Sequence, residues 1–382
     1  MNGQLQISTS SPVLVWAREA AVMSKKNASE KTGLSLSRLN QLEKGAQKPN
    51  LDELKSLAKT YNRTIATLLL KQPPQEKPLP KDCRTLNSNQ IGSFHEKTVV
   101  AIRKARAMAK SLVELKEDFG IPRLNFSIRA TLETSPKKLA QKLRKEWLLS
   151  EIREIENLNH ALEAYIEKVE ELGVAVFQLS LTQDGLRGFS IVDDIVPIIG
   201  IKRGGEAPTS KIFTLFHELG HIILNEGGLC DLKDTNTKRI EIWCNAFSAE
   251  ILVPTDELLN LELVKRYAQE NEKEWVKQHL INIGKRFHVG PLVILRSLLE
   301  NRLTSQAFYK NKHEAWNKPQ FGRAKNPEGR NIAKETIKEK GRTYVSLAFK
   351  AFDQNRIDIK DLSDFLGVRM AYIGKTRELL TS

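Results

Sequence analysis

The sequence predicts an α+β fold in a mainly helical chain of several domains. Apolar residues recur at helical spacing over most of its length, and two short runs between residues 173 and 201 are rich in β-branched residues and glycine. Prolines interrupt the chain at 73–80. At 382 residues the chain is long enough for two or three domains with buried cores.

The first 172 residues predict a small helical domain, a linker and a helical spacer. Residues 11–72 predict five short helices, with apolar positions at Val13, Leu14, Ala17, Leu34, Leu39, Leu42, Leu51, Leu54, Leu57 and Ala58. The stretch "KQPPQEKPLP" holds four prolines in ten residues, so 73–80 is predicted to be an extended linker. Residues 81–172 are rich in Glu, Lys, Leu and Arg and predict the spacer.

Residues 173–300 predict the α+β domain. "GVAVFQLSL" and "GFSIVDDIVPIIGI" indicate strands, and "FTLFHELGHIIL" and "EIWCNAFSAEILVP" indicate two helices, the second ended by Pro254. Val196–Ile201 is either an edge strand to which an extended peptide could add, or an interior strand. Residues 301–341 predict a basic connector and 342–382 a small helical tail.

The pattern HELGH indicates a metal site. His217 and His221 are four residues apart, so both imidazoles project from one helix face and can bind one ion. Catalytic Zn²⁺ needs a third protein ligand, and Glu241, twenty residues after His221, is the favoured candidate. Glu250 is the competing candidate. Alternatively, both histidines are ordinary core residues.

Three further residues of these helices take part in the hypothesis. Glu218 would be the general base that accepts a proton from water during peptide hydrolysis. Asn245 lies one turn after Glu241 and either orients a ligand or is a plain surface residue. We expect Cys244, off the Glu241–Asn245 face, to be a small buried side chain.

Charge is unevenly distributed along the chain. The net charge is +14, but residues 1–80 carry 12 Lys and Arg against 6 Asp and Glu, whereas residues 175–260 carry 7 against 12. A basic module beside an acidic one fits a nucleic-acid contact beside a cation site, although charge kept for solubility explains it equally well. Because no long apolar run or leader is present, we expect no membrane contact and a cytoplasmic location.

The chain resembles the ImmA/IrrE family of regulatory zinc metallopeptidases. The resemblance rests on "RGFSIVDDIVPIIGI", "KIFTLFHELGHIIL", "GLCD" and "EIWCNAFSAEILVP", in that order. It implies a gluzincin-like zincin domain, a small sheet plus the HExxH helix, that cleaves a protein substrate such as a repressor or antitoxin-like regulator. It further implies Zn²⁺ held by His217, His221 and Glu241, with Glu218 as the base. Relatives act in stress response and at toxin-antitoxin loci.

The N-terminal domain resembles the XRE-type, lambda-repressor-like helix-turn-helix through "KTGLSLSRLNQLEKG". The resemblance implies DNA binding and a possible homodimer. Base-facing positions would be Ser35, Ser37, Arg38 and Gln41, and phosphate-facing positions Lys25 and Lys44. The second helix departs from the usual pattern at Lys25, Ala28, Ser29 and Thr32, so a module kept for protein contacts or dimerisation is the alternative.

Two functional hypotheses follow. The first is a cytoplasmic zinc metallo-endopeptidase that cleaves a specific protein regulator and is coupled to a DNA-binding domain. The alternative is a non-proteolytic DNA-binding regulator or antitoxin whose zinc site is structural or sensory. They differ at Glu218, because a structural site has no use for a base.

Overall fold

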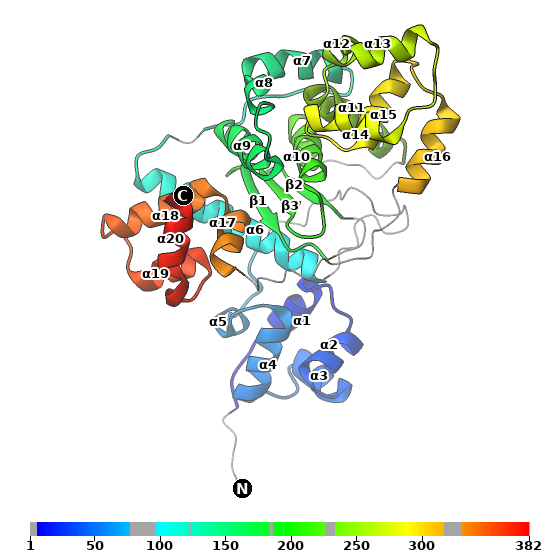
Figure 1. Ribbon diagram of the computed structural model, residues 1–382. Coiled ribbons are helices and arrows are strands. Elements are labelled where there is room, and N and C mark those ends of the chain that lie inside the picture. Colours follow the sequence, from blue (N-terminus) through cyan, green and yellow to red (C-terminus); the bar gives the residue numbers. More distant parts are fainter. Residues whose placement is uncertain are drawn as a thin grey trace. The chain divides into compact units, whose positions relative to one another are not determined.

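The computed structural model describes residues 6–76, 96–122, 124–182, 186–193, 195–225, 234–316 and 331–381. These residues fold as two compact units (Figure 1). The first contains the described parts of Met1–Leu79, Gly92–Lys104 and Thr182–Asp184, and the second contains the rest. Residues 77–80 of the predicted linker and 81–95 of the predicted spacer lie outside the described residues.

The first unit contains the five predicted helices: α1 (Ser11–Ala20), α2 (Lys25–Thr32), α3 (Leu36–Glu43), α4 (Leu51–Tyr61) and α5 (Ile65–Leu68). Each of the last four begins after a Ser, Asn or Thr whose side chain accepts a hydrogen bond from a first-turn N–H. Such caps satisfy donors that have no partner within the helix. The apolar faces meet in one core that includes Leu14, Leu39, Leu42, Leu54, Leu57 and Tyr61.

A left-handed glycine joins α2 to α3. Gly33 has φ 74° and ends α2, a conformation that strains any residue with a side chain. Next to this turn, the Ser29 hydroxyl donates to the carbonyl of Leu34 (2.6 Å) and the Thr32 hydroxyl to that of Ala28 (2.7 Å). Ser29 and Thr32, two of the residues that depart from the usual pattern, therefore donate hydrogen bonds to backbone carbonyls of the helix and turn.

The second unit is built around a three-stranded sheet of order β1-β3-β2. The strands are β1 (Ala175–Leu179), β2 (Gly188–Ile191) and β3 (Ile198–Lys202), with β3 parallel to β1 and antiparallel to β2. The edge-strand alternative for Val196–Ile201 is therefore wrong, because β3 is hydrogen-bonded on both sides. The outer strand that packs against α10 is β2.

Helices surround this sheet and share one hydrophobic core, which confirms the predicted α+β, mainly helical class. Helices α7 (Pro136–Glu146), α8 (Leu149–Ile152) and α9 (Leu158–Glu171) precede the sheet, and α10 (Pro208–Ile223) and α11 (Asp234–Leu252) follow it. Helix α11 packs against both α7 and α10, and α9 packs against α10 (Figure 1). The later helices of the predicted spacer thus belong to the core that supports the HELGH helix.

Short helices complete the second unit. They are α12 (Thr255–Leu259), α13 (Glu262–Gln269), α14 (Lys277–Arg286), α15 (Pro291–Glu300), α16 (Gln306–Trp316), α17 (Ile332–Lys340), α18 (Arg342–Asp353), α19 (Ile359–Leu366), a 3₁₀ turn (Met370–Tyr372) and α20 (Ile373–Thr381). Helices α16 and α17 fall within the predicted connector, whose residues 317–330 lie outside the described part. Helix α17 packs on β1, and Arg203 Nη1 donates to Glu339 Oε2 at 2.7 Å.

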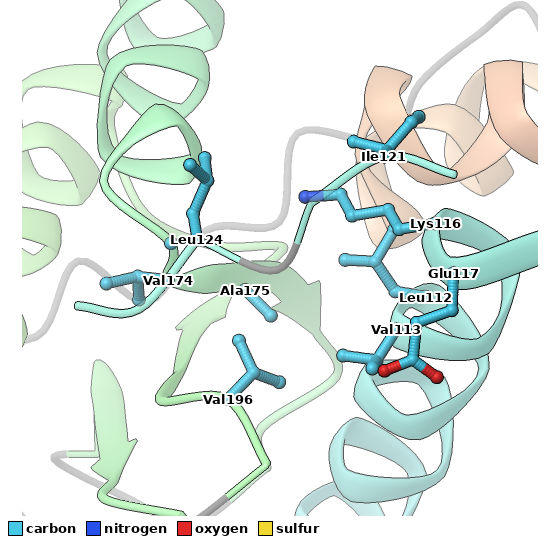
Figure 2. A pocket seen from close by; sticks show the side chains of 10 residues that line it. Leu112, Val113, Lys116, Glu117, Ile121, Leu124, Val174, Ala175 and Val196 are labelled. Carbon is cyan, nitrogen blue, oxygen red and sulfur yellow. The ribbon is translucent and has the colours of Figure 1, made fainter. Parts of the chain in front are cut away.

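Helix α6 (Glu96–Asp118) brings its last turns to the start of β1. Figure 2 shows Leu112 and Val113 of this helix on one side of a small apolar hollow, with Leu124, Val174 and Val196 on the other. No residue of the HELGH motif lines it. Among the described helices, none combines the length and apolarity that a membrane span requires.

Candidate metal centre and nucleic-acid interface

Helix α10 carries the two histidines into the core. Pro208 occupies its first turn, where a missing N–H costs nothing, and nearly every residue from Ile212 to Ile223 is buried. His217 is fully buried and His221 is 5% exposed. Their Nε2 atoms lie 3.2 Å apart, so the helical repeat alone directs both imidazoles to one point.

Helix α11 brings a carboxylate to the same point. Glu241 Oε2 lies 3.3 Å from His217 Nε2, and Glu241 Oε1 lies 3.2 Å from His221 Nε2. Zinc bonds of 2.0–2.1 Å in a tetrahedron place neighbouring ligand atoms about 3.3 Å apart, so the three side chains fit Zn²⁺. The Glu241 side chain is 26% exposed, which leaves the cluster reachable from solvent.

The competing candidate Glu250 lies elsewhere. Its carboxylate accepts hydrogen bonds from the Thr255 hydroxyl (2.6 Å), the Thr255 N–H (3.2 Å) and Gln141 Nε2 (2.8 Å). Among the described residues, the only group of three or more His, Cys, Asp or Glu side chains placed to hold a metal is His217, His221 and Glu241. Glu250 therefore joins α7, α11 and α12.

The cluster has the electrostatics of a cation site. Burial would raise the pKa of Glu241, but hydrogen bonds from both imidazoles hold it well below its usual value. Burial would lower the pKa of His221, but contacts with Cys244, Glu241 and Glu218 raise it well above its usual value. The two shifts favour a negative Glu241 beside positive charge on the imidazoles, and a bound cation would satisfy the same carboxylate.

Glu218 and Asn245 flank the cluster. Glu218 follows His217 directly and is only 2% exposed. A Cβ atom added to Gly188, at the start of β2, would lie 3.3 Å from Glu218 Cγ and 2.6 Å from Thr214 Cγ2. The missing side chain of Gly188 therefore lets β2 pack directly over Glu218. Asn245 is half-buried one turn after Glu241, and its role stays a prediction.

Other contacts at the site were not foreseen. Phe213, one turn before His217, stacks on that imidazole with centroids 6.5 Å apart. Cys244 is buried as expected, but it packs against Gly220 and contacts His221 rather than pointing away from the site. Burial raises the pKa of the Cys244 thiol, which keeps it neutral. A glycine inside an apolar helical pattern was the available signal for close packing, at Gly220.

The proposed DNA-facing residues lie on or near α3. Ser37 and Lys44 are exposed and Gln41 half-buried, at positions that share one helix face. The Ser35 hydroxyl caps α3 by accepting from the N–H of Arg38 (3.1 Å). Exposed Lys25 donates to Asn40 Oδ1 (2.9 Å).

Arg38 is held within the first unit. Its Nε and Nη2 atoms donate to the two carboxylate oxygens of Glu53, both at 2.8 Å. Nη2 also donates to the carbonyl of Lys48 (3.1 Å), and Nη1 donates to Gln47. The structure thus places this guanidinium in a bridge between α3 and α4, and leaves Ser37, Gln41 and Lys44 on the outward face of α3.

Comparison with known families bears on both units. Residues 169–299 match the IrrE N-terminal-like domain, a metallopeptidase-type family, and residues 14–68 match a helix-turn-helix family. The second unit contains an IrrE-like peptidase domain. The predicted resemblances are thus confirmed, and the chain is a DNA-binding regulator that carries an IrrE-like protease domain. No curated protein and no solved structure matches the chain.

The match covers the whole metal cluster. His217, Glu218, His221 and Glu241 all lie within residues 169–299 of the IrrE-like domain, and α3 lies within the helix-turn-helix match. The "GLCD" motif, residues 228–231, lies outside the described residues.

Proposed function

We propose that the chain is a regulatory zinc metallo-endopeptidase that cleaves a protein regulator of the repressor or antitoxin type. The observation that carries this proposal is the convergence of His217, His221 and Glu241 at separations of 3.2–3.3 Å. Glu218 lies buried beside them. The helix-turn-helix would bring this activity to regulators that are bound to DNA.

Different residues of the site would bind the metal and transfer the proton. His217, His221 and Glu241 would hold the zinc ion. Bound zinc supplies Lewis-acid chemistry, which polarises a peptide carbonyl and lowers the pKa of water towards about 7. Glu218 Oε accepts a proton from the attacking water and delivers it to the leaving amine. Because Glu218 is buried under β2, it is shielded from bulk water.

The sheet offers a place for the substrate. Strand β2 is one of the two outer strands of the described sheet, and it packs against α10. Its first residue, Gly188, lies against Glu218. An extended peptide that pairs with β2 would bring a carbonyl close to the base, and main-chain pairing of this kind accepts many side chains.

Substitution of Glu218 by Gln tests the proposal. We expect Glu218→Gln to retain zinc and to lose cleavage by on the order of a hundredfold to ten-thousandfold, because only the proton acceptor is removed. New protein N-termini that form in cells expressing the wild-type chain, and not in cells expressing Glu218→Gln, would identify the substrate. Identical N-termini and an identical regulatory phenotype would instead support a non-proteolytic regulator.

A further inference from the structure

Gly220 occupies a helix position at which glycine is normally unfavourable. It lies in the body of α10, where glycine is a poorer helix former than alanine. Its φ is not in the left-handed region, so no backbone requirement selects it. The reason must therefore be the space that a side chain would occupy.

That space is filled by α11. A Cβ atom added to Gly220 would lie 3.1 Å from Cys244 Sγ, 3.3 Å from Cys244 Cβ and 3.3 Å from Cys244 Cα. These distances are tighter than ordinary van der Waals contacts, and one of the three atoms belongs to the backbone of α11. Because Cys244 is buried and the core is close-packed, relief requires the two helices to separate.

The contact lies next to the ligands. Gly220 is three residues after His217 and directly before His221, and Cys244 is three residues after Glu241. Residues three apart on a helix are neighbours on its surface, so the Gly220–Cys244 contact lies within one turn of each ligand. A change of helix separation there moves the Glu241 carboxylate relative to both imidazoles.

We propose that Gly220 is a positioning residue of the metal centre, whose missing side chain lets α11 approach α10 closely enough for Glu241 to complete the site with His217 and His221. The inference rests on the proposed zinc site and adds the feature that sets the spacing of its ligands. A larger residue at 220 widens the gap between the carboxylate and the imidazoles. Zinc, with short bonds, suffers more from this than a larger divalent ion such as cadmium.

The test compares two Gly→Ala variants of the full chain. Gly220→Ala is expected to weaken zinc binding by on the order of tenfold to a hundredfold, the range found when groups that orient metal ligands are changed. Cadmium binding should weaken by a smaller factor. Gly374→Ala is the matched control, because Gly374 is also helical but has no neighbouring atom within 4 Å of the added Cβ. Its zinc and cadmium affinities should equal those of the wild type.

Competition with a chromophoric chelator measures both affinities, and circular dichroism of the metal-free protein reports folding. The loss caused by Gly220→Ala should be smaller in a Cys244→Ala background, since the nearest atom, Sγ, is then absent. If Gly220→Ala alone does not fold, zinc and cadmium binding by the double variant, compared with Cys244→Ala, decides the question.

Unchanged zinc affinity in Gly220→Ala, or equal losses for zinc and cadmium, would overturn the inference while leaving the zinc site in place. A wild-type chain that binds no zinc would overturn the proposed function itself. The two failures are therefore distinguishable.

Discussion

The Arg18–Glu43 pair of the helix-turn-helix unit and the Glu241 cluster of the peptidase unit compensate buried charge in different ways. In the helix-turn-helix unit, buried Arg18 Nε donates to buried Glu43 Oε1 at 2.6 Å, so the chain supplies both signs. In the peptidase unit, the ion pairs described for Glu241 are with two histidines, whose charge depends on protonation. Burying an ionised carboxylate is costly unless a positive group or several hydrogen-bond donors compensate its charge.

The difference indicates where function lies. The Arg18–Glu43 pair is complete without any ligand and stabilises α1 against α3, whereas the Glu241 cluster becomes electrically balanced only by protons or by a metal ion. Arg38 and Glu53 extend the first pattern at the edge of α3. In this comparison, the pair completed by the chain itself is structural, and the cluster that an added cation would balance is the candidate site.

The largest effect is expected from removal of a metal ligand. His217→Ala, His221→Ala or Glu241→Ala should each lower zinc affinity by at least about a hundredfold, because each removes one of three protein ligands. Elemental analysis after dialysis measures the zinc that remains. Glu250→Gln is the control and should retain one zinc per chain. Full zinc occupancy in Glu241→Ala would place the third ligand elsewhere and remove the contrast between the units.

Breaking the Arg18–Glu43 ion pair should destabilise only the helix-turn-helix unit. Glu43→Ala leaves Arg18 buried without its main partner, so we expect the helix-turn-helix unit to lose about 3–5 kcal/mol of unfolding free energy. Zinc content should not change. Glu19→Ala removes an exposed partner of the same arginine and should cost less than about 1 kcal/mol. If urea denaturation gave equal losses of unfolding free energy for Glu43→Ala and Glu19→Ala, Glu43 would not be the main partner of Arg18.

Glu170, another buried carboxylate of the peptidase unit, predicts a pH effect. Glu170 accepts a hydrogen bond from the Thr343 hydroxyl at 2.7 Å, and burial raises its pKa to about 7, although Thr343 and Lys116 act in the opposite direction. The folded state thus binds this proton more tightly than the unfolded state, whose pKa is near 4.5. This contribution is complete below about pH 4.5 and is lost as the pH rises through 7.

Glu170→Gln tests this effect, since the amide resembles the protonated acid. The wild type should lose up to about 3 kcal/mol relative to Glu170→Gln between pH 5 and pH 8, measured as the difference in unfolding free energy. Parallel pH profiles for the two proteins would show that Glu170 titrates normally in the folded state.

The smallest effects concern DNA. Arg38→Ala should cost about 1–2 kcal/mol of stability, and Glu53→Ala should reproduce its effect on DNA binding, because both break one bridge. Gln41→Ala should instead alter base preference. Lys44→Ala should reduce the slope of log affinity against log salt concentration by about one, the value expected for the loss of one phosphate contact. If Arg38→Ala changed the base preference and Glu53→Ala did not, Arg38 would contact bases in the DNA groove.

The sequence by itself determined what depends on local geometry. The four-residue spacing of His217 and His221 places both imidazoles on one face wherever the helix forms. Likewise, Gly33 and the Ser35 cap define the turn and the start of α3 without help from distant residues. Helical and turn preferences act over a few residues, so the five N-terminal helices and the HELGH helix could be predicted.

Only the tertiary structure decided what depends on distant partners. Spacing made Glu241 and Glu250 rival ligands, and the packing of α10 on α11 placed Glu241 beside the imidazoles while Thr255 and Gln141 engaged Glu250. Pairing with β1 and β2 made β3 an interior strand, and Glu53 drew Arg38 into a bridge. In each case the outcome depends on which of several chemically suitable partners the packed chain brings within bonding distance, and no local pattern encodes that choice.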